Sequence, residues 1–216
     1  MPRAARIDRR QHPGYHRHMS SRIHLTLLSW AAVMLAGAAV QVHAAQVVAV
    51  QVSRDDGRFL IAMRIIIDAS PPAVFRALQD YPAMMRYNPD LRAVRVQSTG
   101  IRGRERVITT IHTCVLVFCK TLHQEQIMTA RADADGGVLK AELLPHAGAF
   151  KAGGARWTVT PCPADASVSC LEAQIELVPA FWVPPVIGPW VIRRKMAEEA
   201  SRTSAGLERM ARGRPP

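Results

Sequence analysis

PAFWVPPVIGPWVIRRKMAEEASRTSAGLERMAR, residues 179–212, joins an apolar, proline-rich segment to a long helical pattern. Pro189 suits the first turn of a helix, and the 24 residues from there to Arg212 would extend about 36 Å. Small and apolar residues recur at steps of four and three, as on a helix face that packs against a core; they are Ile192, Met196, Ala200, Thr203, Leu207 and Met210. The pattern predicts one C-terminal helix laid across a sheet, with a solvated face of Arg194, Glu198 and Arg202.

The chain before this helix is dominated by strand-forming runs between turn residues. Two short helices are also expected, one over 69–79 with Ser70 as its N-cap and one over 83–87 capped by Asp80. Short turns between consecutive strands favour an antiparallel meander, so the predicted class is α+β, a curved antiparallel sheet wrapped around the C-terminal helix. The expected strands are Val47–Val52, Phe59–Ile67, Leu91–Gln97, Val107–Val117, Phe118–Met128, Val138–Leu144, Arg156–Thr160 and Val168–Val178.

The first 45 residues have the composition of a secretory leader. A basic head precedes the apolar run Leu25–Val40, and small residues follow where a signal peptidase cuts. We expect cleavage near Ala44, which leaves a domain of residues 46–216 in the periplasm or outside the cell.

Two alternatives to this leader remain open. An uncleaved anchor is one, although sixteen apolar residues are short for a membrane span. Met19 also opens a leader of ordinary length, so the true start is either Met1 or Met19. If it is Met19, residues 1–18 are a spurious extension.

The positive charge of the chain comes partly from the leader. The formal net charge is +11, and removing the leader, which holds six arginines and one aspartate, lowers it to +6. The remaining basic residues form no aromatic-interleaved cluster, so nucleic acid is not an expected partner. A transient attraction to acidic lipid headgroups is the alternative use of this charge.

Four cysteines fit an exported protein. Cys114 and Cys119 flank four residues, and Cys162 and Cys170 flank seven. Four cysteines allow three pairings, and the two local pairings are favoured because each loop is short. These spacings match no common zinc pattern, so disulfides are expected and a metal site is not.

The order of elements and several local motifs resemble the START-like or SRPBCC superfamily, most closely its polyketide cyclase and coenzyme Q-binding group. The segment Ile67-Asp-Ala-Ser-Pro-Pro-Ala-Val-Phe75 is similar to the family's first strand and helix. Asp80-Tyr81 with Pro89, Arg156-Trp157 and the last helix resemble later parts of it, so the resemblance covers about residues 59–210. It implies a helix-grip fold with a hydrophobic tunnel that holds lipids, quinones, sterols or polyketides.

A cavity between sheet and helix needs apolar walls with a few polar groups. Ala200 and Thr203 are small, so a curved sheet opposite them leaves volume unless larger sheet side chains fill it. Phe150, in a glycine-rich loop over 145–154, and Trp182 are candidate gate residues. The expected ligand-binding residues are Phe75, Leu78, Met84, Met85, Tyr87, Trp157, Trp190, Met196, Ala200, Thr203 and Leu207.

Chemistry-bearing residues are few in the mature chain. If Cys114 and Cys119 bracket a hairpin, His112 pairs with Thr121 and His123 with Thr110 on one face, which is more typical of the solvated side of a sheet. His146 lies in the glycine-rich loop. An inward Glu142, Glu172 or Glu176 would suit general acid or base work, whereas outward positions are the ordinary case. No nucleophile, metal-protease or phosphate-binding motif occurs, and no catalytic residue or cofactor is predicted.

These features favour a non-catalytic periplasmic binder of a hydrophobic small molecule or lipid, such as a quinone or fatty acid. One alternative is a cyclase- or hydrolase-type enzyme that uses a cavity His or Glu. Another is an interaction module that uses the charge-free segment Phe181–Trp190 against a membrane or protein.

Overall fold

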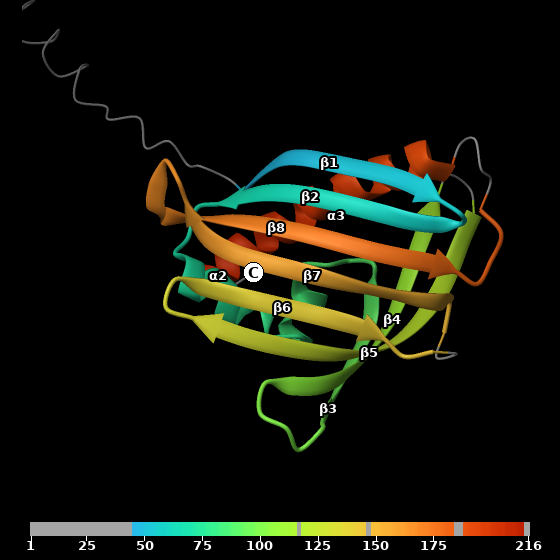
Figure 1. Ribbon diagram of the computed structural model, residues 1–216, viewed down its shortest axis with the longest axis horizontal. Coiled ribbons are helices and arrows are strands. Elements are labelled where there is room, and N and C mark those ends of the chain that lie inside the picture. Colours follow the sequence, from blue (N-terminus) through green and yellow to red (C-terminus); the bar gives the residue numbers. More distant parts are fainter. Residues whose placement is uncertain (1–44, 116–117, 146–147, 184–187, 214–216) are drawn as a thin grey trace, which may run out of the picture. The chain divides into compact units, whose positions relative to one another are not determined.

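The computed structural model describes residues 45–115, 118–145, 148–183 and 188–213 (Figure 1). The predicted leader lies outside these residues. The predicted order of a hairpin, two short helices, consecutive strands and a long helix is confirmed. The elements are β1 (Gln46–Asp55), β2 (Arg58–Ile67), α2 (Pro71–Leu78), the 3-10 helix η1 (Pro82–Arg86), β3 (Leu91–Ser98), β4 (Arg104–Val115), β5 (Phe118–Asp133), β6 (Gly136–Leu143), β7 (Phe150–Cys162), β8 (Asp165–Pro179) and α3 (Gly188–Ala211).

One antiparallel sheet contains all eight strands, in the order β1-β2-β8-β7-β6-β5-β4-β3. Strands β3 to β8 form the predicted meander. The first hairpin joins it through β2 and β8, because α2 and η1 carry the chain from β2 to the opposite edge of the sheet. The sheet is therefore open, with edges at β1 and β3, and it curves around α3 (Figure 1).

The two short helices begin where local chemistry favours them. Pro71 opens α2, where its missing N–H costs nothing. Ser70 occupies the N-cap position, but its side chain makes no capping hydrogen bond, which corrects the prediction in part. Tyr81 occupies the N-cap position of η1, but the Asp80 carboxylate just before it accepts a hydrogen bond from the Ala83 N–H at 3.1 Å, which confirms the predicted role of Asp80 in part.

Helix α3 has the predicted length of 24 residues and packs against β1, β2 and α2. Ala200 and Leu207 are buried and Met196 and Thr203 are half-buried, which confirms the apolar stripe. None of the described helices carries an apolar stretch long enough to cross a membrane.

The solvated side of α3 differs from the prediction at one residue. Arg194 and Glu198 form the expected pair, with Nε and Oε1 3.0 Å apart. Arg202 instead pairs with Glu199, its i, i+3 neighbour, at 3.1 Å. Glu199 thereby lies beside the core rather than among the fully exposed residues.

One end of the interior, here called the packed end, is filled by large apolar side chains. Phe75 from α2 and Leu207 from α3 meet Leu139, Val159 and Leu171 from the sheet, and each of the five is at most 3% exposed. Burial of this kind contributes about 1.5–3 kcal/mol for each large side chain. The packed end accounts for much of the fold's stability.

Strand β7 begins earlier than predicted. The expected loop over 145–154 ends at Phe150, because Gly153 and Gly154 belong to the strand. A Cβ at Gly153 would lie 2.5 Å from the Glu176 carbonyl oxygen, and one at Gly154 would lie 2.8 Å from the Ala141 carbonyl oxygen. These glycines therefore allow neighbouring strands to approach closely and do not mark a flexible loop.

Both predicted disulfides are present. Cys114–Cys119 links the ends of β4 and β5, and Cys162–Cys170 links β7 to β8. The described cysteines include no free thiol.

Candidate functional site

The interior between the sheet and the first half of α3, here called the open end, is less completely packed than the packed end. Alternation along β5 from buried Met128 places Gln126 and Gln124 on the same inner face, and both are only half-buried. The inner residues Ala155 and Trp157 of β7 are likewise only half-buried. These inward-facing side chains are thus packed less tightly than those of the packed end.

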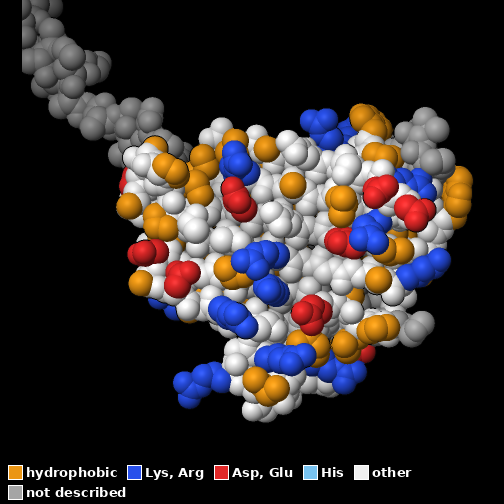
Figure 2. Space-filling model, in the orientation of Figure 1, with side chains coloured by type: hydrophobic (Ala, Val, Ile, Leu, Met, Phe, Trp, Pro, Cys, Tyr) orange, Lys and Arg blue, Asp and Glu red, His pale blue; other side chains and the backbone are white. Residues whose placement is uncertain are grey.

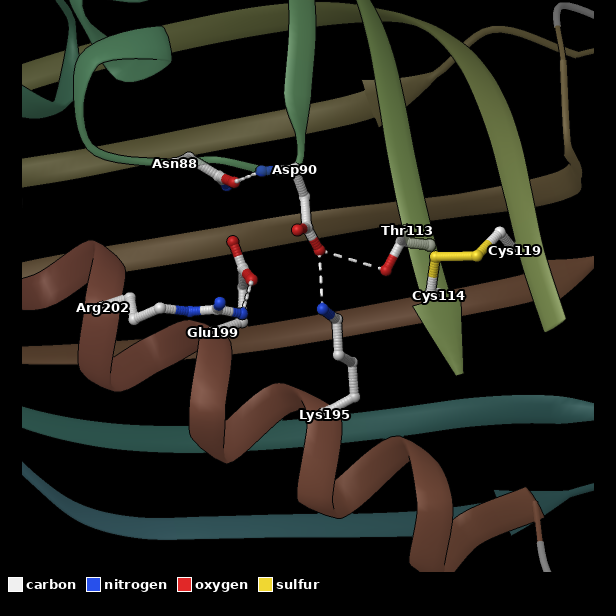
Figure 3. Close-up of polar contacts among 8 residues, drawn as sticks. All are labelled: Asn88, Asp90, Thr113, Cys114, Cys119, Lys195, Glu199 and Arg202. Carbon is white, nitrogen blue, oxygen red and sulfur yellow. Dashed lines mark hydrogen bonds and ion pairs between the residues drawn. A yellow bond between two sulfur atoms is a disulfide. The ribbon is translucent and has the colours of Figure 1, made fainter. Parts of the chain in front are cut away.

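A polar cluster lies at the open end (Figure 3). Asp90, just before β3, accepts a hydrogen bond from the Thr113 hydroxyl at 3.1 Å and forms an ion pair with Lys195 of α3 at 2.7 Å. The Asp90 backbone is held as well, because its N–H donates to the Asn88 side chain and its carbonyl accepts from the His112 N–H. The cluster therefore joins the start of β3, the end of β4 and α3.

The carboxyl groups of this cluster have opposite pKa shifts. Burial alone would raise the pKa of Asp90, but hydrogen bonds from Lys195 and Thr113 and the charges of Lys195 and Arg202 hold it below its usual value. Burial and the negative charge of Asp90 raise the pKa of Glu199, although Arg202 and Lys195 act against this. Glu199 is the carboxyl group here that most readily takes up a proton.

Three buried polar atoms have no hydrogen-bond partner among the described residues: Thr109 Oγ1, Glu199 Oε1 and Thr203 Oγ1. Thr109 is on the inner face of β4 with Val107, and Thr203 is on the inner stripe of α3. An unpaired buried polar group costs about 1–3 kcal/mol. These groups offer hydrogen bonds to the polar end of a bound molecule or to water.

The structure places most of the predicted ligand-binding residues in the interior. Phe75, Tyr87, Ala200 and Leu207 are fully buried. Tyr87 packs on α3 at Gly206, and burial together with the charge of Asp80 raises the pKa of its phenol. Leu78, Met84, Trp157, Met196 and Thr203 are half-buried.

Two predicted ligand-binding residues lie on the surface instead. Met85 is 43% exposed because η1 directs it away from the core, and Trp190 is 60% exposed in the first turn of α3. Neither contributes to an interior wall in this structure. Both were chosen by residue type, and type does not specify which side of a short helix faces inward.

Of the two predicted gate residues, Phe150 contacts the segment between β8 and α3, and Trp182 belongs to that segment. Phe150 begins β7 and packs at a tilt against Phe181, with ring centroids 6.3 Å apart. Lys120 lies over the Phe181 ring, 4.0 Å from its centroid. Trp182 is 78% exposed. Val186 and Ile187, which belong to the same predicted segment, lie outside the described residues.

The predicted catalytic alternatives lie on the outer face of the sheet. Thr110 pairs with His123 and His112 with Thr121, as predicted, and both pairs hydrogen-bond on the exposed side. Glu172 and Glu176 form ion pairs there with Arg64 and Arg58. Figure 2 shows this face, with charged side chains of both signs.

Glu142 is also exposed and alternates with inward Ala141, while His146 lies outside the described residues. The three glutamates are therefore not placed to act in the interior, and the idea of an inward Glu142, Glu172 or Glu176 is wrong for this structure.

An open trough of about 770 Å³ also crosses the outer face of β1, β2, β8 and β7. Its walls include Leu60, Ala62, Gly154 and Glu176, whose carboxylate pairs with Arg58. Ligand pockets usually enclose their ligand in apolar walls. This trough is open and partly polar, so it lacks that character.

Comparison with known proteins agrees with this geometry. Residues 58–212 match the family model described as polyketide cyclase / dehydrase and lipid transport. The chain belongs to this family. Its fold is the START-like helix grip, and the description of the family covers hydrophobic-ligand carriers and cyclase-type domains. No curated protein sequence matches the chain.

Three solved structures illustrate the likeness. The human StarD13 (DLC2) lipid transfer and protein localization domain is 13% identical, with a TM-score of 0.57, and the alignment covers 90% of this chain and 98% of that one. A STAR-related lipid transfer protein from Xanthomonas axonopodis is 15% identical, with a TM-score of 0.53 and coverages of 76% and 98%. The Zhui aromatase/cyclase from Streptomyces sp. R1128 is 14% identical, with a TM-score of 0.51 and coverages of 72% and 92%. At these identities the likeness concerns the fold alone.

Proposed function

We propose that this protein binds a hydrophobic small molecule or lipid with one polar end, such as a quinone or fatty acid, at the open end between the sheet and α3. The observation that carries the proposal is the half-buried inner face of β5 and β7 opposite α3. Apolar walls such as Trp157 and Met196 would take the hydrophobic part of the ligand.

The polar end would be recognised by groups that have no partner in the described residues. Thr109, Glu199 and Thr203 each present one such buried oxygen. The Asp90–Lys195 pair joins α3 to the start of β3 beside Glu199. A hydroxyl or protonated group on the ligand would satisfy these atoms and recover their desolvation cost.

We propose the periplasm or the outside of the cell as the location. Two disulfides support an oxidising compartment. N-terminal sequencing of the exported protein tests this, with cleavage expected near Ala44. A cytoplasmic protein with free thiols would contradict it.

The binding proposal is tested by native mass spectrometry and solvent extraction of protein purified from the periplasm. We expect one bound lipid or quinone, and uptake of added oleic acid or a ubiquinone analogue. Ala155→Phe fills the inner face and should lower binding at least tenfold. Ala62→Phe, on the exposed outer face of β2, is the matched control and should bind as the wild type does.

A second variant addresses the polar end. Thr203→Val keeps the shape but removes the hydroxyl, so the affinity should fall by about 2–10-fold for a ligand that bonds to it. Binding that is unchanged in Ala155→Phe would place the ligand elsewhere. Turnover of an added polyketide-like substrate, lost in Glu199→Gln, would instead favour the cyclase-type function.

An encounter with a membrane surface is a second candidate function, favoured by the exposure of Trp182 and Trp190 and by the cations that contact the neighbours of Trp182, Lys120 at Phe181 and Arg54 at Val183. Trp182 is 78% and Trp190 60% exposed, and Arg54 donates to the Val183 carbonyl in the same segment. Aromatic rings with adjacent cations suit a lipid interface. Flotation with anionic vesicles should recover the wild type and lose Trp182→Ala, while equal flotation of both would exclude this use of the segment.

A further inference from the structure

The tip of the β4–β5 hairpin brings three potential metal ligands together on one face. The register pairs Cys114 with Cys119, and alternation places His112 on the same outer side of the sheet. A ring nitrogen of His112 and the two sulfur atoms all lie within 4.8 Å of one another. In a tetrahedral site the ligand atoms would be about 3.5–3.8 Å apart, because Zn–S is about 2.3 Å and Zn–N about 2.0–2.1 Å.

The surroundings of His112 suit metal ligation. Its Nδ1 hydrogen-bonds with the Thr121 hydroxyl at 3.1 Å, which orients the ring beside the cysteines. Ligation through Nε2 would keep this hydrogen bond, and such outer contacts are typical of ligating histidines. Cys119 is exposed, so the site is open to solvent and to a reductant.

The second disulfide lacks this setting. Cys162 is 8% exposed, and the described His, Cys, Asp and Glu residues form no comparable ligand cluster around Cys162 and Cys170. The two disulfides thus differ in a way that the spacing of cysteines alone does not reveal.

We propose that the hairpin tip is a reducible metal site, in which Cys114, Cys119 and His112 bind a thiophilic d¹⁰ cation, Zn²⁺ or Cu⁺, once the disulfide is reduced. Soft thiolates with one imidazole select these ions. From sequence no metal site is expected, because the cysteine spacings match no common zinc pattern and an oxidising compartment favours disulfides. Those spacings do not include His112, which the sheet register brings beside Cys114 and Cys119.

The redox step balances with a dithiol as reductant. The dithiol is oxidised to a disulfide, and its two electrons and two protons convert Cys114–Cys119 into two thiols. Metal binding then releases two protons as both thiols become thiolate ligands. In the reverse direction a disulfide compound takes the two electrons of the thiolates and two protons from solvent and becomes a dithiol, Cys114–Cys119 forms again, and the cation loses its sulfur ligands.

The test uses the full chain, reduced with dithiothreitol, freed of it without air, and titrated with Zn²⁺ or with Co²⁺ as a spectroscopic probe. We expect one bound ion in the reduced wild type, a thiolate-to-cobalt charge-transfer band, and protection of both cysteines from alkylation. The oxidised protein should bind none. Cys162→Ser/Cys170→Ser should bind as the wild type does, because it keeps the hairpin tip.

Matched variants separate this site from unspecific thiol binding. Cys114→Ser/Cys119→Ser should lose the ion. His112→Ala should weaken metal binding by more than about tenfold, because even loss of a hydrogen bond to a metal ligand typically lowers metal affinity by about that factor. His123→Ala, two residues farther from the tip on the same face, should bind normally. Circular dichroism checks that each variant is folded. No binding by the reduced wild type, or equal binding by His112→Ala, would overturn the proposal.

Discussion

Gly206 shows how one missing side chain sets the position of α3. A Cβ at this position would overlap the Cβ and ring of Tyr87, which is buried against the helix. Glycine in a helix costs about 1 kcal/mol relative to alanine. The close approach of Tyr87 is the structural reason to accept that cost.

Gly206→Ala should therefore destabilise the protein although alanine is the better helix former. Overpacking costs about 1–3 kcal/mol, and the gain in propensity offsets about 1 kcal/mol, so we expect a net loss of up to about 2 kcal/mol. Urea unfolding measures it. Ser201→Ala, on the exposed face of α3, is the control and should change stability by less than about 0.5 kcal/mol. A more stable Gly206→Ala protein would contradict the observed packing of Tyr87.

The pKa of Asp90 makes the stability of the protein depend on pH. Its pKa is lowered in the folded protein, where hydrogen bonds from Lys195 and Thr113 outweigh the effect of burial. A lowered carboxyl pKa means that the unfolded chain binds the proton more readily than the folded one. The stability that Asp90 contributes is therefore present above about pH 4 and is lost as the pH falls through the folded pKa.

Asp90→Asn should remove this contribution. We expect the wild type to lose more stability than the variant between about pH 5 and pH 2 in urea unfolding. Glu198→Gln, which alters an exposed carboxylate paired with Arg194, is the control and should follow the wild type. Parallel curves for wild type and Asp90→Asn would show that the ion pair with Lys195 is not formed in solution.

At the scale of elements, the end of α3 is fastened to the end of β2 by polar contacts. Buried Glu208 accepts a hydrogen bond from the Asp68 N–H at 3.3 Å. Arg212 donates to the Asp68 carbonyl at 2.5 Å and pairs with the carboxylates of Asp68 and Glu208. These contacts hold the helix across the sheet beside the packed end.

Glu208→Ala should loosen this junction. It leaves the Asp68 N–H without its acceptor and removes one of the two carboxylates that pair with Arg212, so we expect a loss of about 1–3 kcal/mol in thermal or urea unfolding. Glu208→Gln keeps one acceptor oxygen and the side-chain shape, so it should recover part of the loss. If Glu198→Ala on the exposed face costs as much as Glu208→Ala, the junction has no special role.

Elements with a clear period were predictable from sequence, and those set by tertiary contact were not. The stripe from Met196 to Leu207 and the register of His112 with Thr121 follow from spacing alone. The start of β7 was missed because Gly153 and Gly154 are typical of loops, whereas neighbouring strands require them here.

The candidate site was only partly predictable for the same reason. Its apolar walls, such as Trp157, could be chosen by residue type. The polar cluster could not, since Asp90, Thr113 and Lys195 are far apart in sequence and meet only when the sheet curves around α3. The helix residues of the cluster did leave one signal in the sequence. Lys195 and Glu199 are spaced at i, i+4, and each follows a member of the predicted solvated face, Arg194 and Glu198.

For the molecule as a whole, stability and adaptability lie at different ends of the interior. The packed end holds several of the largest buried side chains, among them Phe75, Ile67 and Leu207, although Phe59 is buried beside Gly188 at the start of α3. At the packed end Ser169, next to Cys170, is also fully buried and donates to the Ala69 carbonyl at 2.6 Å. The open end holds the half-buried inner residues and the polar cluster. An element that must admit a ligand benefits from low local stability.

The two disulfides should accordingly differ in their effect on unfolding. Both close short loops, with sequence separations of 8 for Cys162–Cys170 and 5 for Cys114–Cys119, so loop entropy predicts similar contributions of about 2–3 kcal/mol. Cys162–Cys170 ties β7 and β8 beside buried Ser169, whereas Cys114–Cys119 closes an exposed hairpin tip that can open alone. Cys162→Ser/Cys170→Ser should lower the melting temperature by about 5–10 °C, and Cys114→Ser/Cys119→Ser by less than half of that. Differential scanning calorimetry of the two variants tests this, and a larger loss from the hairpin tip would mean that the open end, rather than the packed end, limits unfolding.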